Sequence, residues 1–302
     1  MILLLSLLSI LFIGQPLQAA TCSCASIPLL NALENGSAQP NQWFLNFAYE
    51  QHEMNDLVSG SDAVNDETNR QRSATSALVG ISYGLNDKWS LSSMMSHVSH
   101  KRQVGTGEQE VSEGIGDSVF LVKYSPFKIG LFSRKELAFG SGVKIPSGVP
   151  DNRGVSLLSE DMQPGAGAWS FVVWLYGAKS FHASAKTQLF GLVNWSANQQ
   201  NTRLYKQGNE LNVSVGGSYS TDLGLSFTHS FRYRQVAAAQ NEGVDIPNTG
   251  GVWVDSIPAV QYQLNQSVAF KVDSQIPLLR QLNGALQFTT SQLLKGSVSV
   301  VF

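Results

Sequence analysis

The feature that most constrains the fold is a two-residue alternation of apolar with small or polar residues, in runs of about ten residues. Between 211 and 219, apolar residues at 211, 213, 215 and 219 alternate with Asn, Ser, Gly and Ser at 212, 214, 216 and 218, and 223–234 and 293–302 repeat the pattern. Successive side chains of a strand point to opposite faces, whereas a helix repeats its apolar positions every three or four residues. The alternation therefore predicts strands with one apolar face, each long enough to cross a membrane at a tilt.

Twelve such strands can be placed, joined alternately by short and long connections. They span 42–54, 72–84, 88–100, 115–125, 134–146, 168–180, 184–198, 208–220, 222–236, 252–263, 265–276 and 293–302. The short connections lie at 85–87, 181–183, 221–222 and 264–265, and the long ones around residues 62, 108, 151, 201, 241 and 283. Tight periplasmic turns and long outer loops are typical of outer-membrane proteins. We predict an all-β fold, a transmembrane antiparallel up-and-down β-barrel of 12 strands with both termini in the periplasm.

Aromatic residues near the expected periplasmic ends of the strands would form one girdle at the membrane interface. They are Trp43, Tyr83, Trp89, Tyr124, Phe181, Tyr219, Tyr262 and Phe302. The terminal Phe302 also resembles the assembly signal that the barrel-assembly machinery of Gram-negative bacteria reads. A secreted β-sandwich or β-solenoid would share the alternation, but it would predict neither the girdle nor the alternating loop lengths.

The composition agrees with a chain that exposes much of its surface to lipid, because few of its residues are charged. Only 14% of the residues are charged, against roughly 25% in a soluble domain. The formal net charge of −2 lacks the basic excess that nucleic-acid binding needs, so nucleic acid is not an expected partner. The one long apolar run stands at the N-terminus, which excludes a bundle of membrane-spanning helices.

The N-terminus is typical of an export signal. The apolar stretch MILLLSLLSILF is followed by Gly, Pro and two Ala residues, so we predict a signal peptide at 1–20, with an uncleaved anchor helix as the alternative. Residues 21–41 would form a periplasmic N-terminal segment or a small hatch in the lumen, and 42–302 the barrel. Cys22 and Cys24, the two cysteines of the chain, receive no function.

If the apolar faces meet lipid, the opposite faces point into the lumen and carry charges of both signs. The candidates for lining a pore are Glu50, Asp117, Lys123, Glu136, Lys144, Lys186, Arg232, Arg234, Asp255, Lys271 and Asp273. Strand pairing brings Lys123 near Glu136. It also brings Asp117 near Lys144. Such pairs suit a mixed-charge pore lining and a structural ladder in a closed interior equally well, since charges removed from water need partners in both.

One carboxylate is expected to serve two cations. Pairing of the strands at 222–236, 252–263 and 265–276 places Asp255 between Arg234 and Lys271. We predict that these three groups form a ladder on the inner wall.

Histidine and serine residues give little sign of catalysis or metal binding. His97 and His100 would suit metal ligation on a helix, but strand residues three apart face opposite sides. His229 and Ser230 have the residue types of a hydrolase dyad, but adjacent strand residues also point apart. We therefore predict no enzyme activity, no metal and no cofactor.

Several local strings stand in a suggestive order along the chain. They are GIGD at 114–117 leading into SVFLVKY at 118–124, GVKIPSG at 142–148, QPGAG at 163–167, NTGG at 248–251, QIP at 275–277 and NG at 283–284. Over residues 42–302, their order and spacing resemble the outer-membrane transporter family named for the meta-pathway of phenol degradation. The resemblance implies import of aromatic or other hydrophobic compounds, and it provides no site residues.

The expected function is that of a channel or transporter in the bacterial outer membrane, for passive uptake of small molecules, aromatic or hydrophobic ones among them. The expected partners are outer-membrane lipid, lipopolysaccharide and the barrel-assembly machinery. A nonconducting surface protein with an adhesive or structural role is the alternative, and an outer-membrane lipid hydrolase is a less favoured one.

Overall fold

The computed structural model describes residues 40–127, 135–181 and 186–302. The expected signal peptide, nearly all of the 21–41 segment and most of the connection between the predicted strands 115–125 and 134–146 lie outside the described residues. The wall strands are β1 (Trp43–Glu53), β4 (Arg70–Gly84), β5 (Trp89–Val104), β6 (Glu110–Ile115), β7 (Ser118–Phe127), β8 (Lys135–Ile145), β9 (Ser170–Ser180), β10 (Thr187–Asn198), β12 (Glu210–Ser220), β13 (Leu225–Val236), β16 (Gly251–Gln263), β17 (Val268–Leu282) and β19 (Gln292–Val301).

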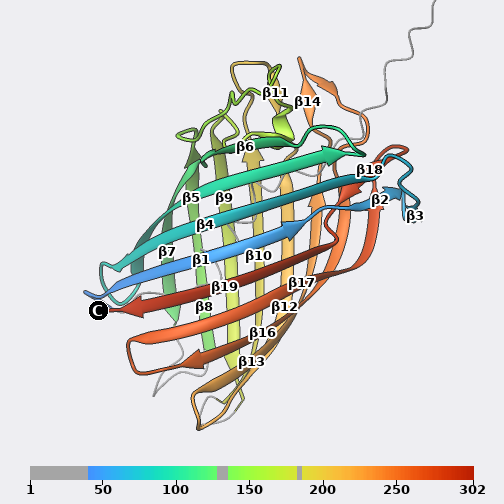
Figure 1. Cartoon of the computed structure of the whole chain (residues 1–302). Coiled ribbons are helices and arrows are strands. Elements are labelled where there is room, and N and C mark those ends of the chain that lie inside the picture. The colour runs from blue at the N-terminus through green and yellow to red at the C-terminus, as the bar shows by residue number, and fades with distance from the viewer. Residues whose placement is uncertain (1–39, 128–134, 182–185) are drawn as a thin grey trace, which may run out of the picture.

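These thirteen segments form one antiparallel sheet that closes on itself, because β1 pairs with β4 on one side and with β19 on the other (Figure 1). β6 and β7 both pair with β5 and are separated only by Gly116 and Asp117, so they form one wall strand. Counting them as one leaves twelve strands. The predicted 12-stranded all-β barrel is confirmed.

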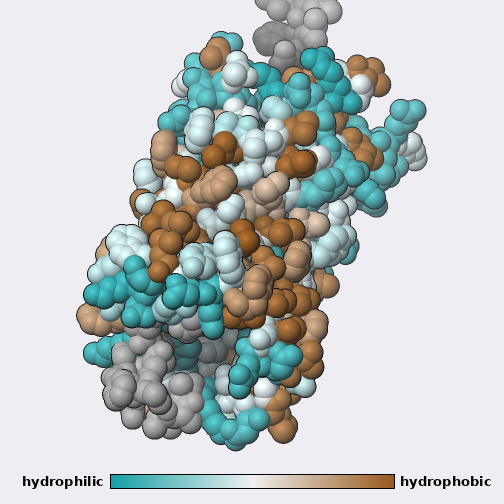
Figure 2. Space-filling model, turned by 90° about the vertical axis from the view of Figure 1, so that its left-hand side faces the viewer, coloured by the Kyte–Doolittle hydropathy of each residue, from teal (hydrophilic) through white to brown (hydrophobic). Residues whose placement is uncertain are grey.

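The outer face of the barrel is apolar. Burial alternates residue by residue along the strands, as in β9 from Ser170 to Leu175. Phe47, Leu175 and Val215 point outward and are about half exposed. Figure 2 shows hydrophobic side chains over the middle of one face and hydrophilic ones toward both ends. A closed sheet leaves no unpaired edge in hydrocarbon, so this is a transmembrane barrel of the outer-membrane type.

The two ends of the barrel differ, and we call them the turn end and the loop end. At the turn end the connections are short, and in one of them Asn86 Oδ1 accepts hydrogen bonds from the backbone N–H groups of Lys88 and Trp89. At the loop end the connections carry β2 (Asp56–Ser59), β3 (Asp62–Val64), β11 (Tyr205–Lys206), β14 (Gln240–Asn241), β15 (Val244–Asp245), β18 (Gln287–Thr289) and the 3-10 helix η2 (Glu160–Met162). By the rule for outer-membrane barrels, the turn end faces the periplasm. No helix among the described residues is both long and apolar enough to span a membrane.

The aromatic girdle lies at the turn end, as predicted. The rings of Trp43 and Tyr83 lie 4.6 Å apart between centroids, and those of Trp89 and Tyr124 lie 4.7 Å apart. Four further aromatic residues are exposed outside the same end: Phe181, Tyr219, Tyr262 and Phe302. Tilted ring pairs at these distances are favourable packing arrangements for aromatic side chains at a membrane interface.

Phe302 joins the end of the chain to the first strand of the barrel. Its N–H donates to Trp43 O at 3.1 Å, and its C=O accepts from Trp43 N at 2.8 Å. Deleting Phe302 removes both hydrogen bonds and one girdle ring, so we expect less folded barrel in the membrane fraction. Gel mobility before and after heating measures this fraction. Phe302→Tyr keeps the backbone bonds and the ring and should match the wild type, whereas a wild-type yield from the deletion would contradict the prediction.

Candidate functional site

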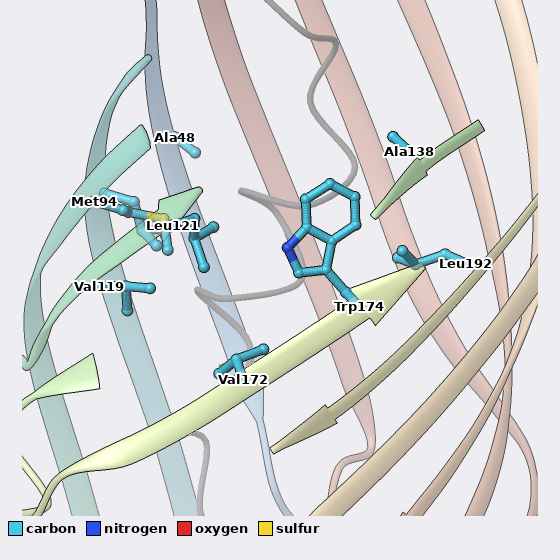
Figure 3. Packing of buried hydrophobic residues seen from close by; sticks show 9 residues of the cluster. Ala48, Met94, Val119, Leu121, Ala138, Val172, Trp174 and Leu192 are labelled. Carbon is cyan, nitrogen blue, oxygen red and sulfur yellow. The ribbon is translucent and has the colours of Figure 1, made fainter. Parts of the chain in front are cut away.

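Part of the barrel interior is apolar. Side chains from β1, β4, β5 and β7 to β10 point into the barrel and pack as one buried cluster (Figure 3). Its members are Ala48, Leu78, Met94, Val119, Leu121, Ala138, Val172, Trp174 and Leu192, and Tyr176 packs against them. We call this surface the apolar wall.

Trp174 is the largest side chain of the apolar wall. A Cβ atom on Gly140 would lie 2.8 Å from the Trp174 ring, so the glycine provides the space that the indole occupies. Lys123 Nζ lies 5.6 Å from the Trp174 ring centroid and 6.0 Å from that of Tyr176, near the limit of cation–π attraction. Trp174 Nε1 is buried without a hydrogen-bond partner among the described residues. The apolar wall therefore presents aromatic rings, a cation and a spare donor.

The inward faces from β12 to β19 are mostly polar and charged, and we call this surface the charged wall. Its buried members are Glu210, Asn212, Ser214, Ser230, Arg232, Arg234, Asp255, Asp273, Gln275 and Lys295. Asp255 Oδ2 accepts from Arg232 Nη2 at 2.9 Å and from Arg232 Nε at 3.2 Å. Asp273 Oδ2 lies 3.2 Å from Lys295 Nζ and 3.9 Å from Lys271 Nζ. These carboxylates offset the cations of the same wall.

The predicted ladder around Asp255 has the wrong register. Asp255 lies directly opposite Arg232, not beside Arg234, which pairs with Glu210 at 3.2 Å. Lys271 pairs with Asp273, so the carboxylate that two cations share is Asp273. Register depends on strand tilt and on a β-bulge between β16 and β17, and the alternation of residue types encodes neither.

Four other predicted lumen residues lie on inward faces. Glu50 is buried opposite Lys295, and Lys123 is buried on β7. Glu136 and Lys144 share the inward face of β8. These four side chains face the interior, as the alternation of residue types predicts. Their role in a pore is a proposal.

Lys186 is an exception and lies at the rim of the turn end. Its Nζ is 2.6 Å from Asp222 Oδ2, and the two side chains are 34% and 83% exposed. The sequence analysis placed Lys186 inside a strand from 184, but β10 begins only at Thr187. The lumen assignment of Lys186 is therefore wrong.

The long connection between β8 and β9 docks against the barrel wall through Asp117. The Asp117 carboxylate accepts from Gly148 N at 3.1 Å and from Ala166 N at 2.9 Å, and Lys144 Nζ lies 3.9 Å away. The predicted approach of Asp117 to Lys144 is confirmed. A Cβ atom on Gly148 would lie 2.8 Å from the Gly165 Cα, so the two backbones meet more closely than other residues allow. The Asp117 carboxylate thus holds the loop.

The connection between β17 and β19 also docks into the loop end. Its segment β18 pairs with β2, and Thr289 Oγ1 accepts from Trp253 Nε1 at 2.9 Å. The ring of Phe288 lies 4.4 Å from the Arg70 guanidinium. Asn248 Oδ1 accepts from the backbone N–H groups of the same connection, at Ala285 and Leu286. Two loops therefore enter the mouth of the barrel.

Five of the strings on which the family resemblance rests meet at these two docking points. Residues 114–117, 142–148 and 163–167 converge on the Asp117 carboxylate. Residues 248–251 and 283–284 converge on the Asn248 amide, and Asn283 Nδ2 donates to Thr249 O at 2.9 Å. Their Gly, Pro and Asn content was the one signal for loop docking, and the sequence analysis did not use it.

Three arginines surround one loop carboxylate at the loop end. Arg72 Nη1 lies 2.5 Å from Asp161 Oδ2, and Arg72 Nη2 also donates to the Asp161 backbone carbonyl. Arg70 and Arg102 each lie 4.0 Å from the Asp161 carboxylate. Burial raises the pKa of Asp161, but Arg72, the Ser159 hydroxyl and the other two arginines together hold that pKa below its ordinary value. Asp161 therefore remains ionised at neutral pH.

The two residues of the hydrolase hypothesis point apart, as predicted. Ser230 is buried, whereas His229 is exposed on the outer face, with Nε2 2.8 Å from Ser256 Oγ and its ring 4.8 Å from that of Phe231. A hydrolase also needs a polar group that orients the imidazole, and Phe231 provides none. Within the described residues, no three His, Cys, Asp or Glu side chains gather as a metal site would require.

Comparison with known proteins places the fold among solved outer-membrane channels. No protein-family model matches the chain, and no curated protein matches it. The chain is similar to the COG4313 outer membrane channel from Pseudomonas putida F1, with a TM-score of 0.67 and 14% identity over 89% of this chain and 98% of the other. The TodX monoaromatic hydrocarbon channel (deltaS2 mutant) has a TM-score of 0.49 and 10% identity, over 94% of this chain and 95% of the other. The KdgM porin has a TM-score of 0.47 and 9% identity, over 86% of this chain and 99% of the other. At 14% identity, the first likeness shows the fold.

Proposed function

We propose that the protein is a channel in the bacterial outer membrane for passive uptake of small molecules. The observation that carries this proposal is the division of the interior into an apolar wall with Trp174 and a charged wall with Arg232 and Asp255. A solute with an apolar body and a polar group can contact both walls at once, in the way that apolar pockets with a few polar groups bind ligands. Transport would be diffusion, with no cofactor.

Two further points support the proposal. The chain shares its barrel fold with a protein described as an outer membrane channel. The strings between 114 and 284 resemble the transporter family named for the meta-pathway of phenol degradation, which favours aromatic solutes. Aromatic rings such as that of Trp174 attract other rings by stacking.

A nonconducting surface protein is the second candidate. It is favoured by the two loops docked in the mouth and by Arg72, whose side chain has no exposed surface. In that case the long loops would form the working surface, and the interior charges would only hold the barrel together.

Single-channel recording of the purified full-length chain in a planar bilayer separates the two candidates. A channel should give discrete conductance steps and a concentration-dependent block by phenol, used as the aromatic probe. A silent bilayer containing folded, heat-modifiable barrel would contradict the channel and support the surface protein.

A pair of tryptophans on neighbouring strands offers a matched test of the apolar wall. Trp174 is buried in the interior, whereas Trp195 is 45% exposed on the outer face. Trp174→Ala should raise conductance and weaken the block by phenol about fivefold, since an aromatic contact contributes about 1 kcal/mol. Trp195→Ala should change neither quantity. Equal effects of the two variants would show that solutes do not meet the apolar wall.

A further inference from the structure

The three arginines at the loop end belong to the barrel wall, while the carboxylate that they surround belongs to a loop. Arg72 of β4 lies directly opposite Arg102 of β5, and Arg70 stands two residues along β4 on the same face. Like charges in directly opposed positions repel. Glu110 of β6 offsets part of this repulsion, since its Oε2 lies 2.6 Å from Arg102 Nε. Asp161, on η2, offsets more of it from within 4.0 Å of all three guanidinium groups. The wall thus forms a cationic cradle, and the loop fills it.

Asp161 uses only part of the binding capacity of Arg72. Arg72 Nη1 meets one carboxylate oxygen, and Nη2 meets the backbone carbonyl instead of the second oxygen. Arg72 Nε and His100 Nδ1 are buried and have no hydrogen-bond partner among the described residues. A guanidinium binds a free carboxylate best through two parallel N–H donors, and the attached Asp161 does not adopt that arrangement.

We propose that Arg70, Arg72 and Arg102 form a binding site for a small carboxylate-bearing solute, which Asp161 occupies in this structure. Asp161 competes with the free carboxylate as an intramolecular ligand, at an effective concentration of about a millimolar. A free carboxylate therefore binds weakly to the wild-type protein and displaces Asp161 when it does. Removing the Asp161 charge removes the competing carboxylate and strengthens binding.

The loop has other anchors that remain when Asp161 is changed. Arg203 binds the neighbouring Glu160 through two hydrogen bonds, of 2.7 Å and 2.6 Å. Asp117 holds the backbone at Gly148 and Ala166. An Asp161 variant therefore tests the cradle, while Glu160→Gln removes an equivalent carboxylate of the same helix that does not touch the cradle.

Titration calorimetry with benzoate, and with benzamide as its uncharged analogue, tests the site in the folded full-length chain. Asp161→Asn should bind benzoate at least tenfold more tightly than the wild type does. The affinity for benzamide should be the same in both proteins. Glu160→Gln should match the wild type. An unchanged benzoate affinity in folded Asp161→Asn would overturn the proposal and leave Asp161 as a loop anchor only.

The wild-type protein provides a second test that does not depend on the folding of a variant. Because benzoate displaces Asp161, it should speed amide hydrogen exchange at 159–163, whereas benzamide should not. Equal exchange with both compounds would overturn the proposal. Either test measures binding and not current, so a chain that binds benzoate without conducting would keep the site and refute the channel.

Discussion

Asp255→Asn should lower the free energy of unfolding by about 3–5 kcal/mol, because it leaves Arg232 buried beside a neutral side chain. Asp255 is 0% exposed and Arg232 is 5% exposed. Both hydrogen bonds from the guanidinium reach the same oxygen, Asp255 Oδ2. Asparagine keeps the shape and one acceptor, so the loss isolates the charge. Urea unfolding of the barrel in lipid vesicles measures the change.

Asp222→Asn is the matched control for this loss of charge. Asp222 forms an ion pair of 2.6 Å with Lys186, but its side chain is 83% exposed. Exposed ion pairs contribute little to stability, because water and salt screen them, so this variant should unfold at the wild-type urea concentration. If Asp255→Asn also unfolds there, water reaches the Asp255–Arg232 pair and the predicted cost of an unpaired buried charge is wrong.

The strands and their facing could be predicted because a two-residue period is local information. In β12, from Leu211 to Tyr219, the apolar side chains show which positions face lipid, and the Asn and Ser side chains show which face the interior. The girdle followed from the same reasoning, since interfacial aromatic residues mark the strand ends. No knowledge of partner strands was needed for either.

The charge pairs could not be predicted as far, because they depend on how neighbouring strands are staggered. A stagger of two residues keeps every side chain on its predicted face and yet changes every partner. Asp255 therefore remained inward but meets Arg232 instead of Arg234. The pair of Asp117 with Lys144 was correct, because Lys144 lies opposite Val119 on the neighbouring strand, only two residues from Asp117.

The arginine cradle could not be predicted at all. Asp161 is 89 positions from Arg72 and lies in a loop without periodicity, so only the docked loop brings the two together. The Gly-rich strings at 142–148 and 163–167 indicated a close backbone approach, but not its target. Loop docking depends on residues far apart in the sequence. A string of loop residues predicts it only when the wall residues that the loop contacts are also known.

A pair of nearly isosteric residues on adjacent strands permits a sharp test of facing. Val215 lies at the middle of β12, 56% exposed on the outer face. Thr228 of β13 lies on the inward face, opposite Ser218 and Ala259. Ser214 would be a poor inward control, since it is 3% exposed and lies opposite Arg232, where a second arginine would be repelled.

Val215→Arg should lower the free energy of unfolding by about 2–4 kcal/mol, because it places a charge in hydrocarbon near the bilayer midplane. Thr228→Arg should cost clearly less, because its charge enters a polar part of the interior. Urea unfolding in vesicles measures both variants, and because valine and threonine have nearly the same shape, the two changes add about the same volume. Only the medium around the new side chain differs between the two variants. Equal losses of stability would therefore mean that the interior next to β13 is as unfavourable to charge as lipid. The channel would then have no aqueous path along the charged wall.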